Sequence, residues 1–298
     1  MSNRITAALH GIKLRIGESI RNVGSALSRP TGDLANEVQT SVNRLTHGDQ
    51  QSAVTIRTGA ASTPGEQFIQ ETRFTSVEPI YGGGAPFRLT SSDGRGHYVY
   101  KPISMQKHGQ REGIPSTPGA LAQRETAAFR VDQLLGFGRV PPTAMIDGPY
   151  GPGSAQLWVY SRAVTARYRP SKPQSEEMAV LDYIIGSSDR HAGNYRIGRN
   201  EGIVAIDNEL SFPERPDPWA GIRSEFVKSH QNVPLSEEVL RKVDAVDPNH
   251  LRMVLRDIGL SPQAVDGAHA RLVEIQKRGM ITGEAWAGRI TTIPPLPD

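Results

Sequence analysis

The chain has 298 residues, a net charge of +3 and no cysteine. The lack of cysteine excludes a disulfide framework, a thiolate zinc site and a cysteine nucleophile. So small a charge permits contact with phosphates or anionic lipids but gives no reason to expect nucleic-acid binding. No apolar run is long enough to cross a bilayer and charges interrupt the N-terminus, so neither a transmembrane segment nor a signal peptide is expected.

Residues 1–70 differ in composition from the rest and are expected to form an N-terminal extension. Apolar residues spaced by three and four predict an amphipathic helix over residues 5–27. A second short helix is expected over 31–47, and residues 48–67 are typical of a linker. Two interpretations of the first helix stay open. It packs on the body of the protein or on its own copy, or its basic amphipathic surface contacts a membrane or a partner protein.

The rest of the chain predicts strands first and helices later, which is an α+β pattern. Alternation and turn residues indicate strands over 74–81, 87–90, 97–102, 140–147 and 156–161. Helical spacing and end signals indicate helices over 119–135, 174–185, 236–243, 248–258 and 262–278. A small hairpin is expected at 194–199 and 203–207. No internal repeat is present.

A polar loop after the helix over 174–185 holds the densest group of reactive residues. Asp189, Arg190, His191 and Asn194 lie in this loop, and Asp207 follows a short apolar strand. Phosphoryl transfer needs one carboxylate to orient the acceptor hydroxyl, and a second carboxylate with an amide oxygen to hold Mg²⁺. Asp189 and Asn194 have the same separation as the catalytic Asp and metal-binding Asn of protein kinases. Arg190 or His191 is available to neutralise charge on the transferred phosphoryl group.

A simpler explanation of these residues is a capped turn, because Asp and Asn favour loops. The order of the residues favours catalysis instead. The motif D-R-H-x-x-N at 189–194, followed by Ala205–Pro213 with its aspartate, resembles the phosphatidylinositol 3- and 4-kinases. The stretch Ala205–Pro213 is especially similar to the type II phosphatidylinositol 4-kinases and their bacterial relatives. Aspartate–asparagine at this point is also found in the toxin kinase HipA and the secretory Fam20 kinases.

The resemblance covers roughly residues 75–280 and implies a bilobal protein-kinase-like fold. Its β-rich N-lobe would span 71–161 and its mostly helical C-lobe 162–298, with ATP in the cleft. Lys101 on a strand would contact the nucleotide phosphates, and Glu125 on the next helix would pair with it. Gln156–Tyr160 would be the strand that meets adenine. The phosphates would be covered by the backbone N–H groups of Gly82, Gly83 and Gly84.

The activity implied is transfer of the γ-phosphoryl group of ATP, with Mg²⁺ or Mn²⁺, to a hydroxyl of a protein or a phosphoinositide. No Ala-Pro-Glu follows Asp207, which disfavours the usual docking of a substrate peptide. Arg215, Arg223 and Lys228 do not form the basic segment that selects the headgroup in the lipid kinases, so both acceptors stay open. Two alternatives remain, a pseudokinase that binds nucleotide or a partner and a kinase-fold enzyme that transfers AMP. The bacterial cytoplasm and delivery into a host cell as an effector are both consistent with this chain.

Overall fold

The computed structural model describes residues 62–80, 85–107, 111–165, 167–216, 219 and 221–293. All of them belong to one compact unit, Gly48–Asp298. The helices expected over 5–27 and 31–47, and the glycines Gly82, Gly83 and Gly84, lie outside the described residues. Within the described part of the chain, no helix is both long and apolar enough to cross a membrane.

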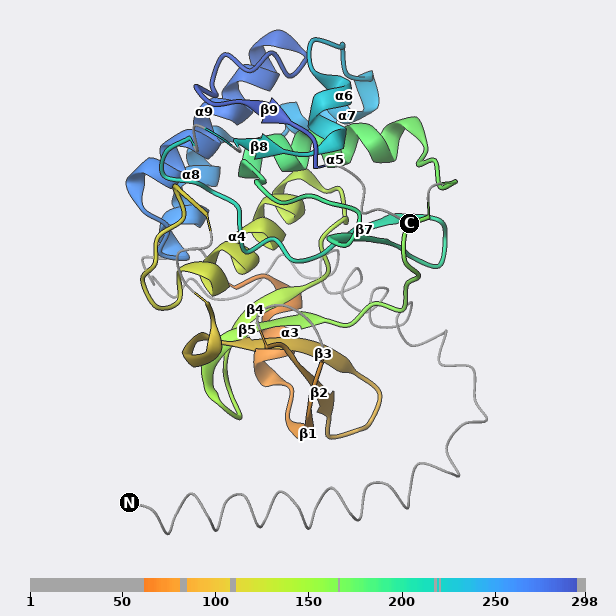
Figure 1. Cartoon of the computed structure of the whole chain (residues 1–298), viewed down its shortest axis with the longest axis vertical. Helices are drawn as coiled ribbons and strands as arrows, with labels where there is room; N and C mark the ends of the chain where they lie inside the picture. The colour runs from red at the N-terminus through yellow and green to blue at the C-terminus, as the bar shows by residue number, and fades with distance from the viewer. Residues whose placement is uncertain are drawn as a thin grey trace, which may run out of the picture. The chain divides into compact units, whose positions relative to one another are not determined.

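A five-stranded antiparallel sheet forms one layer of this unit, with the strand order β1-β2-β3-β5-β4 (Figure 1). The strands are β1 Phe74–Pro79, β2 Phe87–Ser91, β3 His97–Pro102, β4 Thr143–Gly148 and β5 Gly151–Leu157. Side chains alternate between the two faces of a strand. In β3 this alternation buries Tyr98 and Tyr100 on one face and places Lys101 on the other.

The strand expected over 156–161 is displaced, because β5 begins at Gly151 and ends at Leu157. Glycine and proline at 151–153 predict a turn rather than a strand, since both residues weaken strands. In the structure only Pro149 and Tyr150 separate the paired ends of β4 and β5. A Cβ atom at Gly153 would lie 2.5 Å from the carbonyl oxygen of Lys101, so glycine permits the close approach of β5 to β3.

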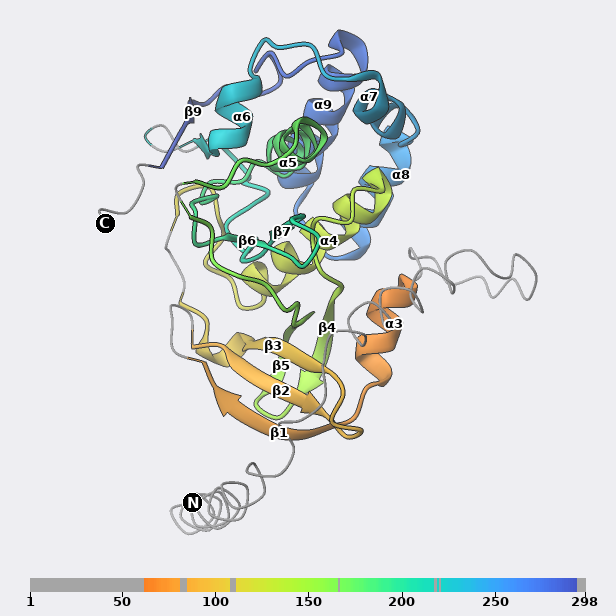
Figure 2. The ribbon, with the colours of Figure 1, turned by 90° about the vertical axis from the view of Figure 1, so that its right-hand side faces the viewer.

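Of the linker expected over 48–67, residues 48–61 lie outside the described residues, and the expectation is wrong for 64–67, because Pro64–Glu71 forms helix α3. Thr63 and Glu66 make a reciprocal capping box at its start, with hydrogen bonds of 3.2 Å and 2.7 Å. The buried carboxylate of Glu66 also pairs with Arg130. Helix α3 lies beside β4 in Figure 2, so it belongs with the sheet.

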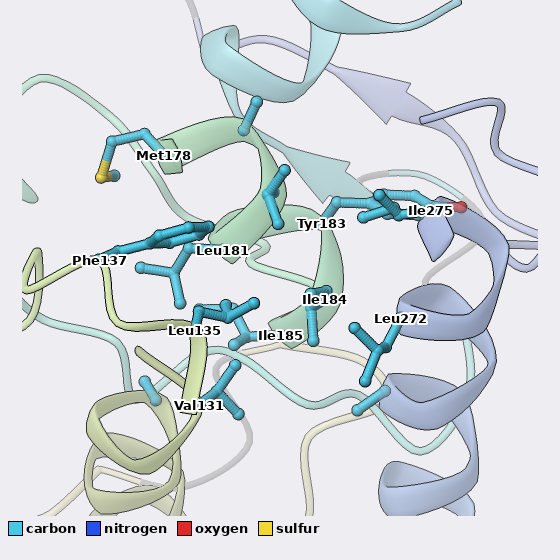
Figure 3. Packing of buried hydrophobic residues seen from close by; sticks show 14 of the residues in the cluster. Val131, Leu135, Phe137, Met178, Leu181, Tyr183, Ile184, Ile185, Leu272 and Ile275 are labelled. Carbon is cyan, nitrogen blue, oxygen red and sulfur yellow. The ribbon is translucent and has the colours of Figure 1, made fainter. Parts of the chain in front are cut away.

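Helices make the second layer, and the helices expected in this part of the chain are confirmed. They are α4 Ala120–Leu135, α5 Lys172–Ile185, α7 Glu237–Asp244, α8 Pro248–Asp257 and α9 Pro262–Arg278. A short helix, α6 Glu225–His230, was not anticipated. Helix α4 lies between the sheet and the group of helices α5 to α9 (Figure 2). Apolar side chains of α4, α5 and α9 form much of the core, including Val131, Leu135, Leu181, Ile184, Leu272 and Ile275 (Figure 3).

Short paired strands complete the described part of this unit. The hairpin of β6 Tyr195–Ile197 and β7 Ile203–Ala205 was expected. Strands β8 Ile222–Arg223 and β9 Ile290–Thr291 pair in parallel. A β-rich layer followed by a mostly helical layer is the α+β, bilobal kinase-like arrangement expected from the sequence. The candidate site residues come from both layers, with Lys101 on β3 and Glu125 on α4, and from the segments before β6 and after β7.

Candidate active site

Lys101 of β3 connects the sheet with the segment that follows β7. Its Nζ atom donates to Glu125 Oε2 at 3.2 Å, to Asp207 Oδ1 at 2.6 Å and to Glu209 Oε2 at 3.0 Å. Glu125 comes from α4, whereas Asp207 and Glu209 follow β7. The structure therefore brings together one lysine and three carboxylates from three separate parts of the chain.

The side chains of Lys101, Glu125 and Glu209 are largely buried, whereas 43% of the Asp207 side chain is exposed. Burial lowers the pKa of Lys101, but the carboxylates of Glu125, Asp207 and Glu209 together raise that pKa well above its usual value. Burial also opposes ionisation of Asp207, yet the Lys101 ammonium lowers the pKa of this carboxyl. Burial has the largest effect on Glu209 and raises the pKa of its carboxyl, the Lys101 ammonium opposes this effect, and the neighbouring Asp207 and Glu125 carboxylates raise the pKa further. The site thus holds a fixed cation among carboxylates of unequal acidity.

Glu125 also fixes the backbone beside Asp207. Its Oε1 atom accepts a hydrogen bond from the backbone N–H of Asn208 at 3.0 Å. Asp207 itself has φ = +56°, in the left-handed region that few residues other than glycine adopt. Aspartate tolerates this conformation better than most residues do. Backbone held in this way is common at functional sites, where the surrounding contacts over-determine it.

Asn194 links the Asp189–Asn194 loop to the strand that leads to Asp207. Its Nδ2 atom donates to the backbone oxygen of Asp189 at 2.8 Å. The backbone oxygen of Asn194 accepts from the N–H of Ile206, the residue before Asp207, at 3.0 Å. With the amide nitrogen turned to Asp189, the side-chain oxygen of Asn194 is the atom that can coordinate a cation.

His191 lies at the outer side of the same loop, with 37% of its side chain exposed. Its Nδ1 atom accepts from the backbone N–H of Gly193 at 2.9 Å, and its Nε2 atom is 3.8 Å from Asp189 Oδ2. A Cβ atom at Gly193 would lie 2.7 Å from the imidazole ring. Glycine at this position therefore allows the ring to fold back over the loop towards Asp189.

Arg190 occupies a different place from the one expected of a residue that neutralises a phosphoryl group. Its side chain is 1% exposed and pairs with the fully buried Asp182 of α5 at 3.0 Å. Its guanidinium also donates to the backbone oxygens of Asn194 and Ile206 and to Asn208 Oδ1. These contacts connect α5, the Asp189–Asn194 loop and the segment around Asp207. Arg190 is therefore placed to hold this loop and this segment in position.

Two residues at the site were missed by sequence reasoning. Glu209 stands two positions after Asp207, and its carboxylate could have been recognised as a third acid in that stretch. Arg111 lies in the connection between β3 and α4, where no periodicity or motif marks it. Its Nη2 atom is 3.1 Å from Asp189 Oδ1. Gln156, expected at the adenine strand, has its side chain directed to Thr143 Oγ1 at 2.9 Å.

The carboxylates around Lys101 have the chemistry of a divalent-cation site. One oxygen each from Glu125, Asp207 and Glu209 lies within 4.8 Å of the others. Carboxylate oxygens, with an amide oxygen such as that of Asn194, are the ligands preferred by Mg²⁺ and Mn²⁺. The residues present therefore fit the metal that a kinase needs.

Comparison with known proteins places this chain in a family. The chain is 46% identical over 152 residues to Protein Rv2133c of Mycobacterium tuberculosis, covering 38% of this chain and 53% of that protein. It is 28% identical over 183 residues to phosphatidylinositol 4-kinase gamma 4 of Oryza sativa subsp. japonica, covering 49% of this chain and 32% of that protein. The chain thus spans about half the length of the first relative and about a third of the second.

A solved structure, that of hydra Fam20 with sugar, shares the fold. It aligns with a TM-score of 0.52 at 15% sequence identity and covers 80% of this chain and 96% of that one. The sequence pattern of the family described as phosphatidylinositol 3- and 4-kinase matches residues 88–262, which include every candidate residue from Lys101 to Asp207. The chain belongs to the phosphatidylinositol 3- and 4-kinase family.

Proposed function

We propose that the protein transfers the γ-phosphoryl group of ATP to a hydroxyl group, in a reaction that depends on Mg²⁺. The observation that carries this proposal is the meeting of Lys101 with Glu125, Asp207 and Glu209 next to the Asp189–Asn194 loop. A lysine paired with a helical glutamate and a nearby metal-binding aspartate are required together for phosphoryl transfer by protein kinases. Here the pair is already formed at 3.2 Å.

Each side chain has a role that follows from its place. Lys101 holds the nucleotide phosphates, and Glu125 keeps its ammonium group in position. Asp207 and the Asn194 amide oxygen hold Mg²⁺, which when bound neutralises charge on the phosphates. Asp189 orients the acceptor hydroxyl and accepts its proton. Arg190 holds the Asp189–Asn194 loop in place from the protein interior, and His191 contacts Asp189 from the solvent-exposed side.

By resemblance to the family, the backbone N–H groups of Gly82, Gly83 and Gly84 cover the phosphates, and the segment Gln156–Tyr160 meets the adenine. The acceptor is a serine or threonine hydroxyl of a protein or an inositol hydroxyl of a lipid. Relatives named phosphatidylinositol 4-kinase gamma support the lipid. Delivery to a host cell and membrane contact through residues 5–27 stay predictions, which a reporter fused to residues 1–70 would test.

Labelled ATP tests the proposal. Wild type and Asp207→Ala would each be incubated with γ-³²P-ATP and Mg²⁺, with phosphoinositide vesicles in one tube and a protein extract in another. We expect label in one acceptor with wild type and none with Asp207→Ala. Label in lipid identifies a lipid kinase, and label in protein identifies a protein kinase. Nucleotide binding without label in either tube would contradict the proposal and favour a pseudokinase.

A further inference from the structure

Arg111 contacts the proposed catalytic carboxylate from a segment outside the motif. It lies in the connection between the short 3-10 helix η2 (Ile103–Met105) and α4. Its Nη2 atom donates to Asp189 Oδ1 at 3.1 Å, and only 18% of the Arg111 side chain is exposed. The guanidinium therefore stands where the acceptor hydroxyl and the transferred phosphoryl group would meet.

The segment that carries Arg111 is fixed to the chain that follows Asp207. The backbone N–H of Glu214 donates to the oxygen of Gly113 at 2.8 Å. Gly113 has φ = +81°, and a Cβ atom there would lie 2.3 Å from the backbone oxygen of Arg215, so the two segments touch at backbone distance. Ile114 packs in a small buried cluster with Leu121 and Leu210. The position of Arg111 is thus set by packing and hydrogen bonds on both sides.

Arg111 has donors to spare. A guanidinium carries five N–H groups in a rigid fork, and this one bonds Asp189 through Nη2. Its Nε atom is buried and has no hydrogen-bond partner among the described residues. A buried donor without an acceptor is unfavourable, so the arrangement favours a ligand that brings oxygen atoms to this guanidinium. A phosphoryl group offers such oxygens in a geometry that matches the fork of arginine.

The other cations of the site are already engaged with protein groups. Arg190 is buried against Asp182, the Asn208 side chain and two backbone oxygens. Lys101 donates to three carboxylates and, under the proposed function, holds the phosphates of the bound nucleotide. The task that the sequence suggested for Arg190 therefore falls to an arginine about eighty positions earlier in the chain.

We infer that Arg111 binds the non-bridging oxygens of the phosphoryl group during its transfer, an inference that rests on the proposed function. In the reaction, the acceptor O–H bond breaks and its proton moves to Asp189. The acceptor oxygen bonds to the γ-phosphorus while the bond to the β,γ-bridging oxygen breaks, and ADP leaves with that electron pair. Arg111 forms no covalent bond. Its N–H groups stabilise the charge on the oxygens that face Asp189.

Hydrolysis of ATP by the full chain tests this role without knowledge of the acceptor, because water then takes the phosphoryl group. We expect Arg111→Ala to lower kcat by about 10²–10³-fold with little change in the KM for ATP. Added guanidinium ion should restore part of the rate to Arg111→Ala and none to Arg111→Lys. Arg278→Ala removes an exposed ion pair with Glu284 and serves as the matched control, with wild-type kinetics.

Binding of a phosphoryl-transfer mimic gives a second readout that needs no turnover. Calorimetry would compare ADP with ADP plus aluminium fluoride, in the presence of Mg²⁺. We expect Arg111→Ala to lose most of the added affinity that aluminium fluoride gives wild type, while ADP alone binds both equally. Arg111→Gln keeps the stem as far as Cδ and a polar end but no guanidinium, and it should show the same loss if the alanine variant does not fold.

The outcomes separate the inference from the function on which it rests. Wild-type rates and wild-type affinity for the mimic in a folded Arg111→Ala or Arg111→Gln would overturn the role of Arg111 alone. Loss of rate without loss of affinity for the mimic, and without guanidinium rescue, would also overturn it and would leave Arg111 a structural residue. Absence of ATP turnover by wild type would overturn both proposals.

Discussion

Replacement of Arg190 by alanine tests whether this motif residue acts through structure. Its guanidinium pairs with Asp182, whose side chain is fully buried and also accepts from Ser224 Oγ at 2.7 Å. The same guanidinium donates to the backbone oxygens of Asn194 and Ile206. Arg190→Ala removes all of these contacts of the guanidinium. The Asp182 carboxylate then stays buried and keeps the hydrogen bond from Ser224 Oγ.

The loss can be sized from the burial of the pair. Removal of one partner of a buried ion pair destabilises a protein by about 3–5 kcal/mol, because the other charge stays behind without compensation. A domain of this size loses about 2–4 °C in Tm per kcal/mol. We therefore expect a fall in Tm of about 6–20 °C. Exposed pairs contribute about 0–1 kcal/mol, so Arg278→Ala should shift Tm by only about 0–4 °C.

Thermal unfolding followed by circular dichroism measures both variants beside wild type. The double variant Asp182→Asn/Arg190→Ala sharpens the test, because it removes the charge that the single variant strands in the interior. We expect the double variant to be more stable than Arg190→Ala alone. A folded Arg190→Ala with wild-type Tm and a large loss of turnover would refute this reasoning and return Arg190 to a direct role in the reaction.

Three further predictions follow from other contacts. Lys101→Met removes the cation from between Glu125, Asp207 and Glu209, so Mg²⁺ without nucleotide should raise the Tm of this variant more than that of wild type; an equal shift would argue against a metal site there. Gly193→Ala would set a Cβ atom 2.7 Å from His191, so we expect a loss of turnover with little change in Tm, measured by ATP hydrolysis and thermal unfolding. Burial raises the pKa of Asp132 to about 7, against hydrogen bonds from the backbone N–H groups of Arg139 and Val140. Because this folded pKa exceeds the unfolded value of 3.8, the stability it contributes is present at low pH and is lost as pH rises through about 7. Asp132→Asn should therefore weaken the decline in Tm between about pH 4 and pH 7, and an unchanged decline would contradict this assignment.

The sequence predicted local features of the fold well. The spacing of apolar residues located α4, α5, α7, α8 and α9, because a helix buries one face along its whole length. Helix α3 was missed because its composition matches a linker, although Thr63 and Glu66 carried a capping signal. Strand β5 was displaced because its glycines serve a close approach to β3, which only the folded sheet reveals.

Some features of the candidate site were likewise predictable from the sequence, and others were not. Asp189, Asn194 and Asp207 stand in a motif with fixed spacing, and the structure brings their segments together. The orientation of Arg190 depends on Asp182 on the preceding helix α5, and no local sequence pattern predicts that contact. Arg111 reaches Asp189 only through the folding of the connection between β3 and α4. Tertiary contacts of this kind lie beyond what spacing can predict.

Identification of the nucleotide product tests the central claim most directly. Wild-type protein, Asp189→Ala and Asp207→Ala would be incubated with ATP and Mg²⁺, and the nucleotides separated by anion-exchange chromatography. Phosphoryl transfer predicts ADP from wild type, none when Mg²⁺ is chelated, and a large loss in both variants. AMP as the product would show transfer of a different group. ATP that is bound and released unchanged by wild type would contradict the assignment of this site as a phosphotransferase.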